Sequence, residues 1–262
     1  MGVLSMFALG VCYIIALIVA FGHYNTPTFV WWWYLVGVTS ICLARALRAG
    51  GTACTIVCFA YFHRSAFMHC TVERDCLFDV TLCSPLWGRT VACIGELAMV
   101  HLIFSRVVPR RAPLYVTAIA IAECISFLGV IKRQYWFFMF ENGTWMVVAA
   151  IVAATIAKNW ARGQLGDDAR ELKLLAMFAL GFLAVYNAVE DLPMYYRRSQ
   201  ELDHRRGLSF LEGLGHSAVC QQVTSSEAVW RPQMIWMGLN YTLAPFACLY
   251  IQATTTIAAK RA

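Results

Sequence analysis

The chain contains about seven runs of mostly apolar residues, and each is long enough to cross a lipid bilayer, which takes about 20 residues of helix. The runs cover residues 3–21, 28–47, 85–107, 112–131, 134–157, 171–195 and 234–258. Because backbone groups in a bilayer must satisfy their own hydrogen bonds, such runs predict helices. With 60% hydrophobic and 14% charged residues, the chain has little length left for a soluble domain. The sequence predicts an all-α, polytopic membrane helix bundle of about seven transmembrane helices, with residues 1–262 as a single integral membrane domain.

The connections between these runs fall on two sides of the predicted bundle. Side A carries the two long loops, 48–84 and 197–233, and side B carries short basic linkers. Residues 52–62 are apolar but too short to cross, so we expect them to be re-entrant, interfacial or folded back. Basic residues divide almost evenly between the sides, and those in short loops favour side B as the cytoplasmic side. The orientation and the particular membrane stay open.

Two carboxylates lie at the centres of apolar runs. Glu96 is in the middle of residues 85–107, and Glu123 is in the middle of residues 112–131. An ionisable group at the bilayer midplane costs at least about 2.5 kcal/mol, so it marks a functional site by default. Arg89 precedes Glu96 by seven residues, or two helical turns, and is expected on the same face nearer side A.

Other polar side chains enter the runs from side A. They are Glu141, Asn142, Asn187, Glu190, Asp191, Asn240 and Tyr241. Asn187 reaches Glu190 and Asp191 at the i+3 and i+4 spacings of a helix. We therefore expect a polar cup that opens to side A and has Glu96 and Glu123 as its floor.

The chemistry of this cup follows from its acids. Several carboxylates in a low-dielectric interior need protons, cations or water to coexist, so at least one of Glu96 and Glu123 is expected to be neutral at rest. The predicted catalytic residues are Glu96, Glu123, Glu141, Glu190 and Asp191. The predicted substrate-binding residues are Arg89, Asn142, Asn187, Asn240 and Tyr241. The alternative is structural, because polar side chains also hold membrane helices together.

The cysteines of side A suggest a disulfide. Cys70, Cys76, Cys83 and Cys220 match no zinc-binding spacing, and an extracytoplasmic side A would allow a disulfide among them. No metal and no cofactor is predicted. The chain also lacks HExxH, GxSxG and phosphate-cradling glycine motifs, a lysine in the last run for retinal, and the paired histidines of intramembrane zinc hydrolases.

Three functions remain. The first is an intramembrane acid–base enzyme that acts on a lipid or isoprenoid, which the 14% aromatic content favours. The second is a proton- or cation-coupled transporter or channel for a small solute. The third is a non-catalytic membrane sensor or complex subunit. The expected partners are membrane lipid and a lipid or small-solute ligand. The net charge of +6 is typical of topology signals rather than nucleic-acid binding, and the oligomeric state stays open.

Overall fold

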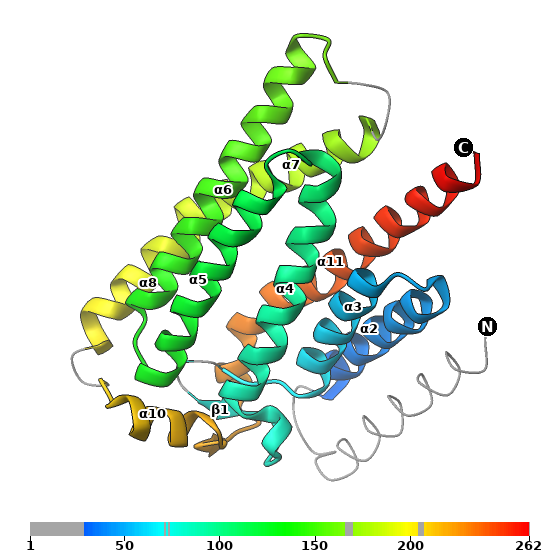
Figure 1. Ribbon diagram of the computed structural model, residues 1–262. Helices are drawn as coiled ribbons and strands as arrows, with labels where there is room; N and C mark the ends of the chain where they lie inside the picture. Colours follow the sequence, from blue (N-terminus) through cyan, green and yellow to red (C-terminus); the bar gives the residue numbers. More distant parts are fainter. Residues whose placement is uncertain (1–28, 71, 73, 166–169, 204–206, 262) are drawn as a thin grey trace. The chain divides into compact units, whose positions relative to one another are not determined.

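The computed structural model describes residues 29–70, 72, 74–165, 170–203 and 207–261, and most of them are helical (Figure 1). Within the described residues, four helices are long and apolar enough to cross a membrane: Pro85–Val107, Ala112–Lys132, Trp136–Ala161 and Arg170–Asp203. Two predictions are confirmed: the fold is all-helical, and several of its helices are long enough to cross a membrane. The count of seven spans stays a prediction. The run at 3–21 lies outside the described residues, and those at 28–47 and 234–258 correspond to α2 (Phe29–Ala49) and part of α11 (Glu227–Arg261).

The chain forms two compact units. Unit 1 comprises Met1–Met99 and His216–Ala262, and unit 2 comprises Val100–Gly215. The chain passes from unit 1 to unit 2 inside α4 (Pro85–Val107) and returns inside α10 (Phe210–Ser217). Whether the two units form one membrane domain stays a prediction.

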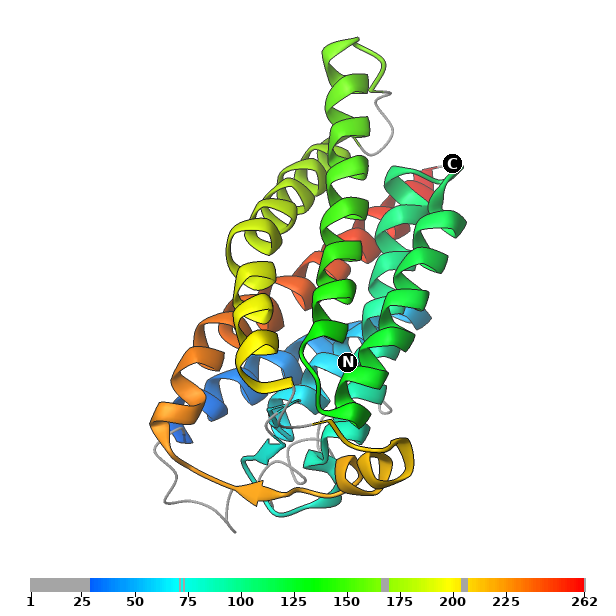
Figure 2. The same cartoon turned by 90° about the vertical axis from the view of Figure 1, so that its left-hand side faces the viewer.

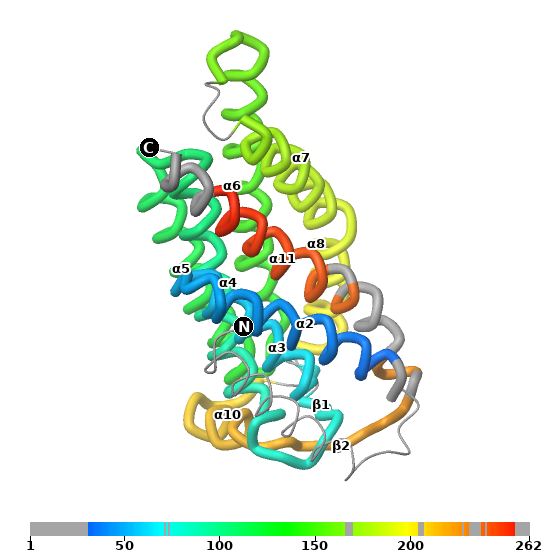
Figure 3. Tube along the Cα trace, turned by 90° about the vertical axis from the view of Figure 1, so that its right-hand side faces the viewer, coloured from blue at the N-terminus to red at the C-terminus, as the bar shows by residue number. Residues whose placement is uncertain are grey.

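In unit 1, three helices pack against one another. The helix α3 (Thr52–Ala66) folds back on α2, and α11 packs on both (Figure 3). The reversal between α2 and α3 occurs at Gly50, whose φ of +74° is a conformation that glycine adopts without strain. The apolar run at 52–62 is therefore a folded-back continuation, and it extends four residues further into the loop than predicted. Buried Trp32, Leu35 and Cys58 are part of this core.

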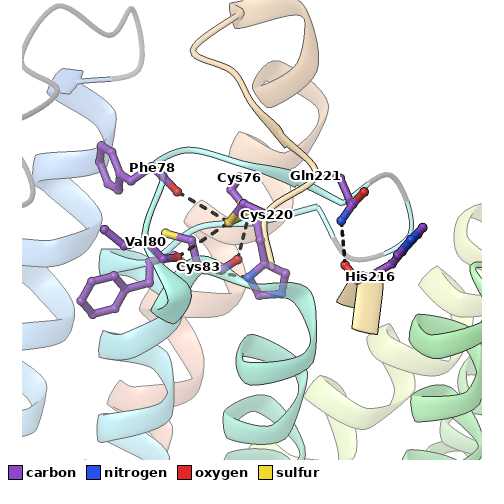
Figure 4. The surroundings of a disulfide bond; sticks show 9 residues. Cys76, Phe78, Val80, Cys83, His216, Cys220 and Gln221 are labelled. Carbon is purple, nitrogen blue, oxygen red and sulfur yellow. Dashed lines mark hydrogen bonds between the residues drawn. A yellow bond between two sulfur atoms is a disulfide. The ribbon is translucent and has the colours of Figure 1, made fainter. Parts of the chain in front are cut away.

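Two short strands of unit 1 pair although they lie far apart in the sequence. The strand β1 (Asp75–Cys76) pairs in parallel with β2 (Gln222–Val223), with Asp75 opposite Gln222. A disulfide joins Cys76 to Cys220, across 144 residues of sequence (Figure 4). The Cys220 sulfur also lies 3.7 Å from the carbonyl oxygens of Phe78 and Val80. The predicted disulfide is confirmed, and Cys70 and Cys83 are buried cysteines outside it. The turn η1 (Thr81–Cys83) then leads into α4.

In unit 2, α5 (Ala112–Lys132) and α6 (Trp136–Ala161) form a tight helical hairpin (Figure 1). The segment after α6 is α7 (Arg170–Tyr186), a π-helical turn η2 (Asn187–Asp191), α8 (Leu192–Arg198) and a second π-helical turn η3 (Ser199–Asp203). Figure 2 shows α7 and α8 running alongside α6. The sequence predicted one ordinary helix over most of this segment and missed both π-helical turns.

The end of this segment returns to the start of α6. The Asp203 carboxylate accepts hydrogen bonds from the main-chain N–H groups of Tyr135, at 2.7 Å, and of Trp136, at 3.1 Å. These are N–H groups that a helix start leaves without an intrahelical partner. The Asp203 side chain, 68 residues after Tyr135 in the sequence, thus caps α6 and fixes the α5–α6 turn. The sequence predicted only a polar loop around Asp203.

Candidate functional site

Two buried carboxyl groups meet in unit 2. Glu123 of α5 is 1% exposed and Glu141 of α6 is 5% exposed. Their carboxylate oxygens lie within 4.8 Å of each other. The pairing follows from the hairpin, because Glu123 lies about three turns before the end of α5 and Glu141 lies in the second turn of α6. The sequence expected both residues in one polar site, and the structure brings these two together.

Trp145 completes the surroundings of Glu123. Its indole N–H donates a hydrogen bond to Glu123 Oε1 over 3.3 Å. Trp145 follows Glu141 by four residues, so both side chains lie on the same face of α6. The Ser126 hydroxyl donates to the Glu123 carbonyl oxygen at 2.7 Å, which keeps this polar side chain satisfied within α5. Sequence reasoning missed Trp145, although its i+4 spacing from Glu141 was the signal that could have found it.

The two predicted asparagines of unit 2 join α6 to the π-helical turn. Asn187 is buried, and its Nδ2 donates to the Asn142 carbonyl oxygen at 3.3 Å. Asn142 Nδ2 donates to the Phe138 carbonyl oxygen at 2.9 Å. The expected contacts of Asn187 with Glu190 and Asp191 assumed α-helical spacing, but these residues form a π-helical turn, in which i+3 and i+4 neighbours no longer align in the same way. Glu190 is exposed and Asp191 is half-buried.

Unit 1 contains a second polar cluster, which takes side chains from α3, α4 and α11. Arg64 Nη1 lies 3.8 Å from Glu96 Oε1, and the Arg64 guanidinium lies over the ring of Tyr241, 5.6 Å from its centroid. The Tyr61 hydroxyl donates to Asn240 Oδ1 at 3.4 Å, and its ring packs edge-on against Tyr241. We call these five residues the α3 cluster.

The sequence predicted three members of the α3 cluster, namely Glu96, Asn240 and Tyr241. It missed Tyr61 and Arg64, because the run that ends at residue 62 was treated as an apolar segment followed by a loop. Their i, i+3 spacing would have marked a polar helix face if the helix had been extended to Ala66. Arg89 is buried in the second turn of α4. Its place near side A stays a prediction.

Two histidines line the end of unit 1 near the disulfide. Trp87 donates to His63 Nε2 at 2.9 Å. The His69 ring packs so closely on Gly88 that a side chain there would overlap the imidazole. Burial lowers the pKa of His69 to about 3, and the neighbouring Arg64 contributes in the same direction. His69 is therefore neutral at physiological pH and serves as a packing residue.

The described residues thus present two buried polar clusters, one in each unit. A cup that combines Glu96 with Glu123 would take residues from both units, and it stays a prediction. Comparisons of the chain with protein-family models, with curated proteins and with solved structures found no match.

Proposed function

We propose that the protein is an intramembrane enzyme in which Glu123 and Glu141 act as an acid–base pair on a lipid or isoprenoid. The observation that carries this proposal is the approach of the two buried carboxyl groups within 4.8 Å, from two membrane-length helices. Two carboxylates this close repel strongly in a low-dielectric interior, so a proton or a cation must accompany them. A shared proton gives one group that can donate and one that can accept.

The chemistry follows from this division of roles. The ionised carboxylate removes a proton from the substrate, and the protonated partner delivers a proton elsewhere on the same molecule, so the site ends with the same number of protons. The Trp145 N–H donates to Glu123 Oε1, and a proton-accepting carboxylate can keep this contact because its oxygens accept hydrogen bonds. We assign Glu123 as the base and Glu141 as the acid.

An apolar substrate suits the surroundings of this pair. The face of α7 that carries Leu175, Phe178, Phe182 and Val185 is apolar and exposed, and Val189 of η2 is exposed as well, as for a surface in contact with lipid tails. A substrate dissolved in the bilayer would reach such a protein laterally, without crossing water. Hydrolysis of a reactive intermediate would be limited in a site that excludes water.

A proton- or cation-coupled transporter is the second candidate, and one observation favours it. The membrane-length segment Arg170–Asp203 is interrupted by the π-helical turn η2, followed at once by Pro193. Interruptions of spanning helices often accompany ion and solute sites. In this function Glu123 and Glu141 would exchange a proton or cation between the two sides, without changing the substrate covalently.

A pair of assays separates the two candidates. Purified wild type, Glu123→Gln and Glu141→Gln are incubated in detergent with lipid extracts, and turnover is followed by mass spectrometry. They are also reconstituted in proteoliposomes, and pH-driven uptake is followed there. Glu171→Gln is the matched control, because Glu171 is an exposed acid at the start of α7. The enzyme predicts lipid turnover without a gradient that both variants lose and the control keeps. Uptake without turnover would favour the transporter.

A further inference from the structure

The α3 cluster of unit 1 contains an arginine with unused hydrogen-bonding capacity. A guanidinium has five N–H donors arranged as a planar fork. The Arg64–Glu96 separation of 3.8 Å is an ion pair but is longer than a hydrogen bond. Arg64 Nε is buried, and it has no hydrogen-bond partner in the described part of the chain. A buried donor left without a partner is costly, so a ligand that accepts from it would be favoured.

The guanidinium is also held in place for a ligand. It lies over the ring of Tyr241, and that ring packs against Tyr61, whose hydroxyl donates to Asn240. Tyr61 and Tyr241 are 5% and 2% exposed, so this support is firmly packed. An arginine stacked on an aromatic ring presents its N–H edge in a fixed orientation, which lowers the entropy lost on binding.

The geometry of the guanidinium indicates which anion would fit. Arg64 lies in the last turn of α3, which ends at Ala66. Phosphate oxygens match the arginine fork in a bidentate arrangement, which gives two hydrogen bonds to a charged group. Phosphate is also the charged group of many bilayer lipids.

We propose that the α3 cluster is a binding site for a phosphate group, in which Arg64 is the principal ligand. On binding, the phosphate takes hydrogen bonds from the Arg64 fork in place of the Glu96 carboxylate. The phosphate belongs to a lipid head group or to free inorganic phosphate. The proposed site takes its residues from unit 1 alone.

The test is a titration of purified protein in detergent with three probes: a short-chain phosphatidic acid, the diacylglycerol with the same tails, and inorganic phosphate. The two lipids differ only in the phosphate. Dissociation constants are measured by microscale thermophoresis for wild type, Arg64→Gln and Arg64→Lys. Arg198→Gln is the matched control, because Arg198 lies over the Tyr135 ring at the same 5.6 Å.

We expect phosphatidic acid to bind wild type more tightly than diacylglycerol does. Its dissociation constant should rise at least about tenfold in Arg64→Gln, as expected for loss of hydrogen bonds to a charged group. It should rise less in Arg64→Lys, which keeps the charge and loses the fork. Arg198→Gln should bind as wild type does. Binding of inorganic phosphate with the same dependence on Arg64 would support the site and identify free phosphate as the source.

Two results would overturn the proposal. One is equal affinity of wild type and Arg64→Gln for every probe. The other is phosphatidic acid binding no more tightly than diacylglycerol, together with no Arg64-dependent binding of inorganic phosphate. Circular dichroism and gel filtration show whether Arg64→Gln folds. If it does not, the affinity of Arg64→Lys for phosphatidic acid tests the role of Arg64 instead. Phosphatidic acid affinity in that variant equal to wild type would then count against Arg64 as the ligand.

Discussion

The indole N–H of Trp145 donates a hydrogen bond to Glu123 Oε1 at 3.3 Å, which links the two helices that bring Glu123 and Glu141 together. The contact is a donor aimed at one carboxyl group of a close acidic pair. An acid–base pair requires two inequivalent carboxyl groups, and this contact of Glu123 is one that can distinguish them.

The first prediction concerns this donor. Trp145→Phe keeps an aromatic ring and removes the N–H, so the Glu123 carboxyl group loses this hydrogen bond. A hydrogen bond to a charged group contributes roughly 1.5–3 kcal/mol, so we expect activity to fall about tenfold or more. The fold should be retained. Steady-state rates against pH provide the measurement, and the profile should also change shape. Trp160→Phe is the control, because Trp160 is an exposed tryptophan of the same helix. An unchanged rate and profile in Trp145→Phe would show that the contact is only structural.

The second prediction concerns the cap of α6. Asp203→Ala leaves the Tyr135 and Trp136 N–H groups without their carboxylate, so we expect a loss of about 1–3 kcal/mol in the free energy of unfolding. The measurement is the unfolding midpoint in detergent, monitored by circular dichroism. Glu201→Ala, an exposed acid of the same π-helical turn, should have little effect. Equal midpoints for Asp203→Ala and wild type would contradict the cap.

The third prediction concerns the disulfide. Alkylation in denaturant without reductant should leave the peptides that contain Cys76 and Cys220 unmodified and linked, whereas Cys70 and Cys83 should be modified. Prior reduction should make all four react. Peptide mass spectrometry distinguishes these states. Because the bond closes a long loop, Cys76→Ser should cost roughly 3–5 kcal/mol of stability. Modification of Cys76 and Cys220 before reduction would contradict the bond.

The fourth prediction concerns His69. Its pKa is about 3 in the folded protein and 6.5 in an exposed chain, so below about pH 6.5 only the unfolded ring takes up a proton. Stability should therefore fall as the pH falls from 7 towards 4, by up to about 1.4 kcal/mol per pH unit. The measurement is the unfolding midpoint as a function of pH. His69→Gln should reduce this slope, and His216→Gln, at an exposed histidine, should keep it. A slope unaffected by His69→Gln would assign the pH dependence to other groups.

The sequence predicted those features of the fold that depend on local residue patterns. Apolar length predicted the membrane-length helices, and the isolated charges at Glu123 and Glu141 marked buried positions, whereas Glu96 is only half-buried. The shared side of the two long loops predicted the disulfide, although four cysteines allowed several pairings.

Sequence reasoning missed features that depend on tertiary contacts. Asp203 caps a helix that begins 67 residues earlier, at Trp136, and no local pattern reveals such a partner. The π-helical turns depend on how α7 packs on α6, because a π turn costs backbone energy that packing must offset. Arg64 and Tyr61 were missed because the end of α3 was placed too early.

The central claim is that Glu123 and Glu141 share a proton at neutral pH. Infrared spectroscopy tests it without knowledge of the substrate, because a protonated carboxyl group has a C=O stretch that a carboxylate lacks. We predict that wild type and Glu171→Gln show this band at pH 7, and that the spectrum of the Glu123→Gln/Glu141→Gln double variant loses intensity there while the protein stays folded. Equal bands in wild type and double variant would contradict the claim, because they would show that both carboxyl groups are ionised.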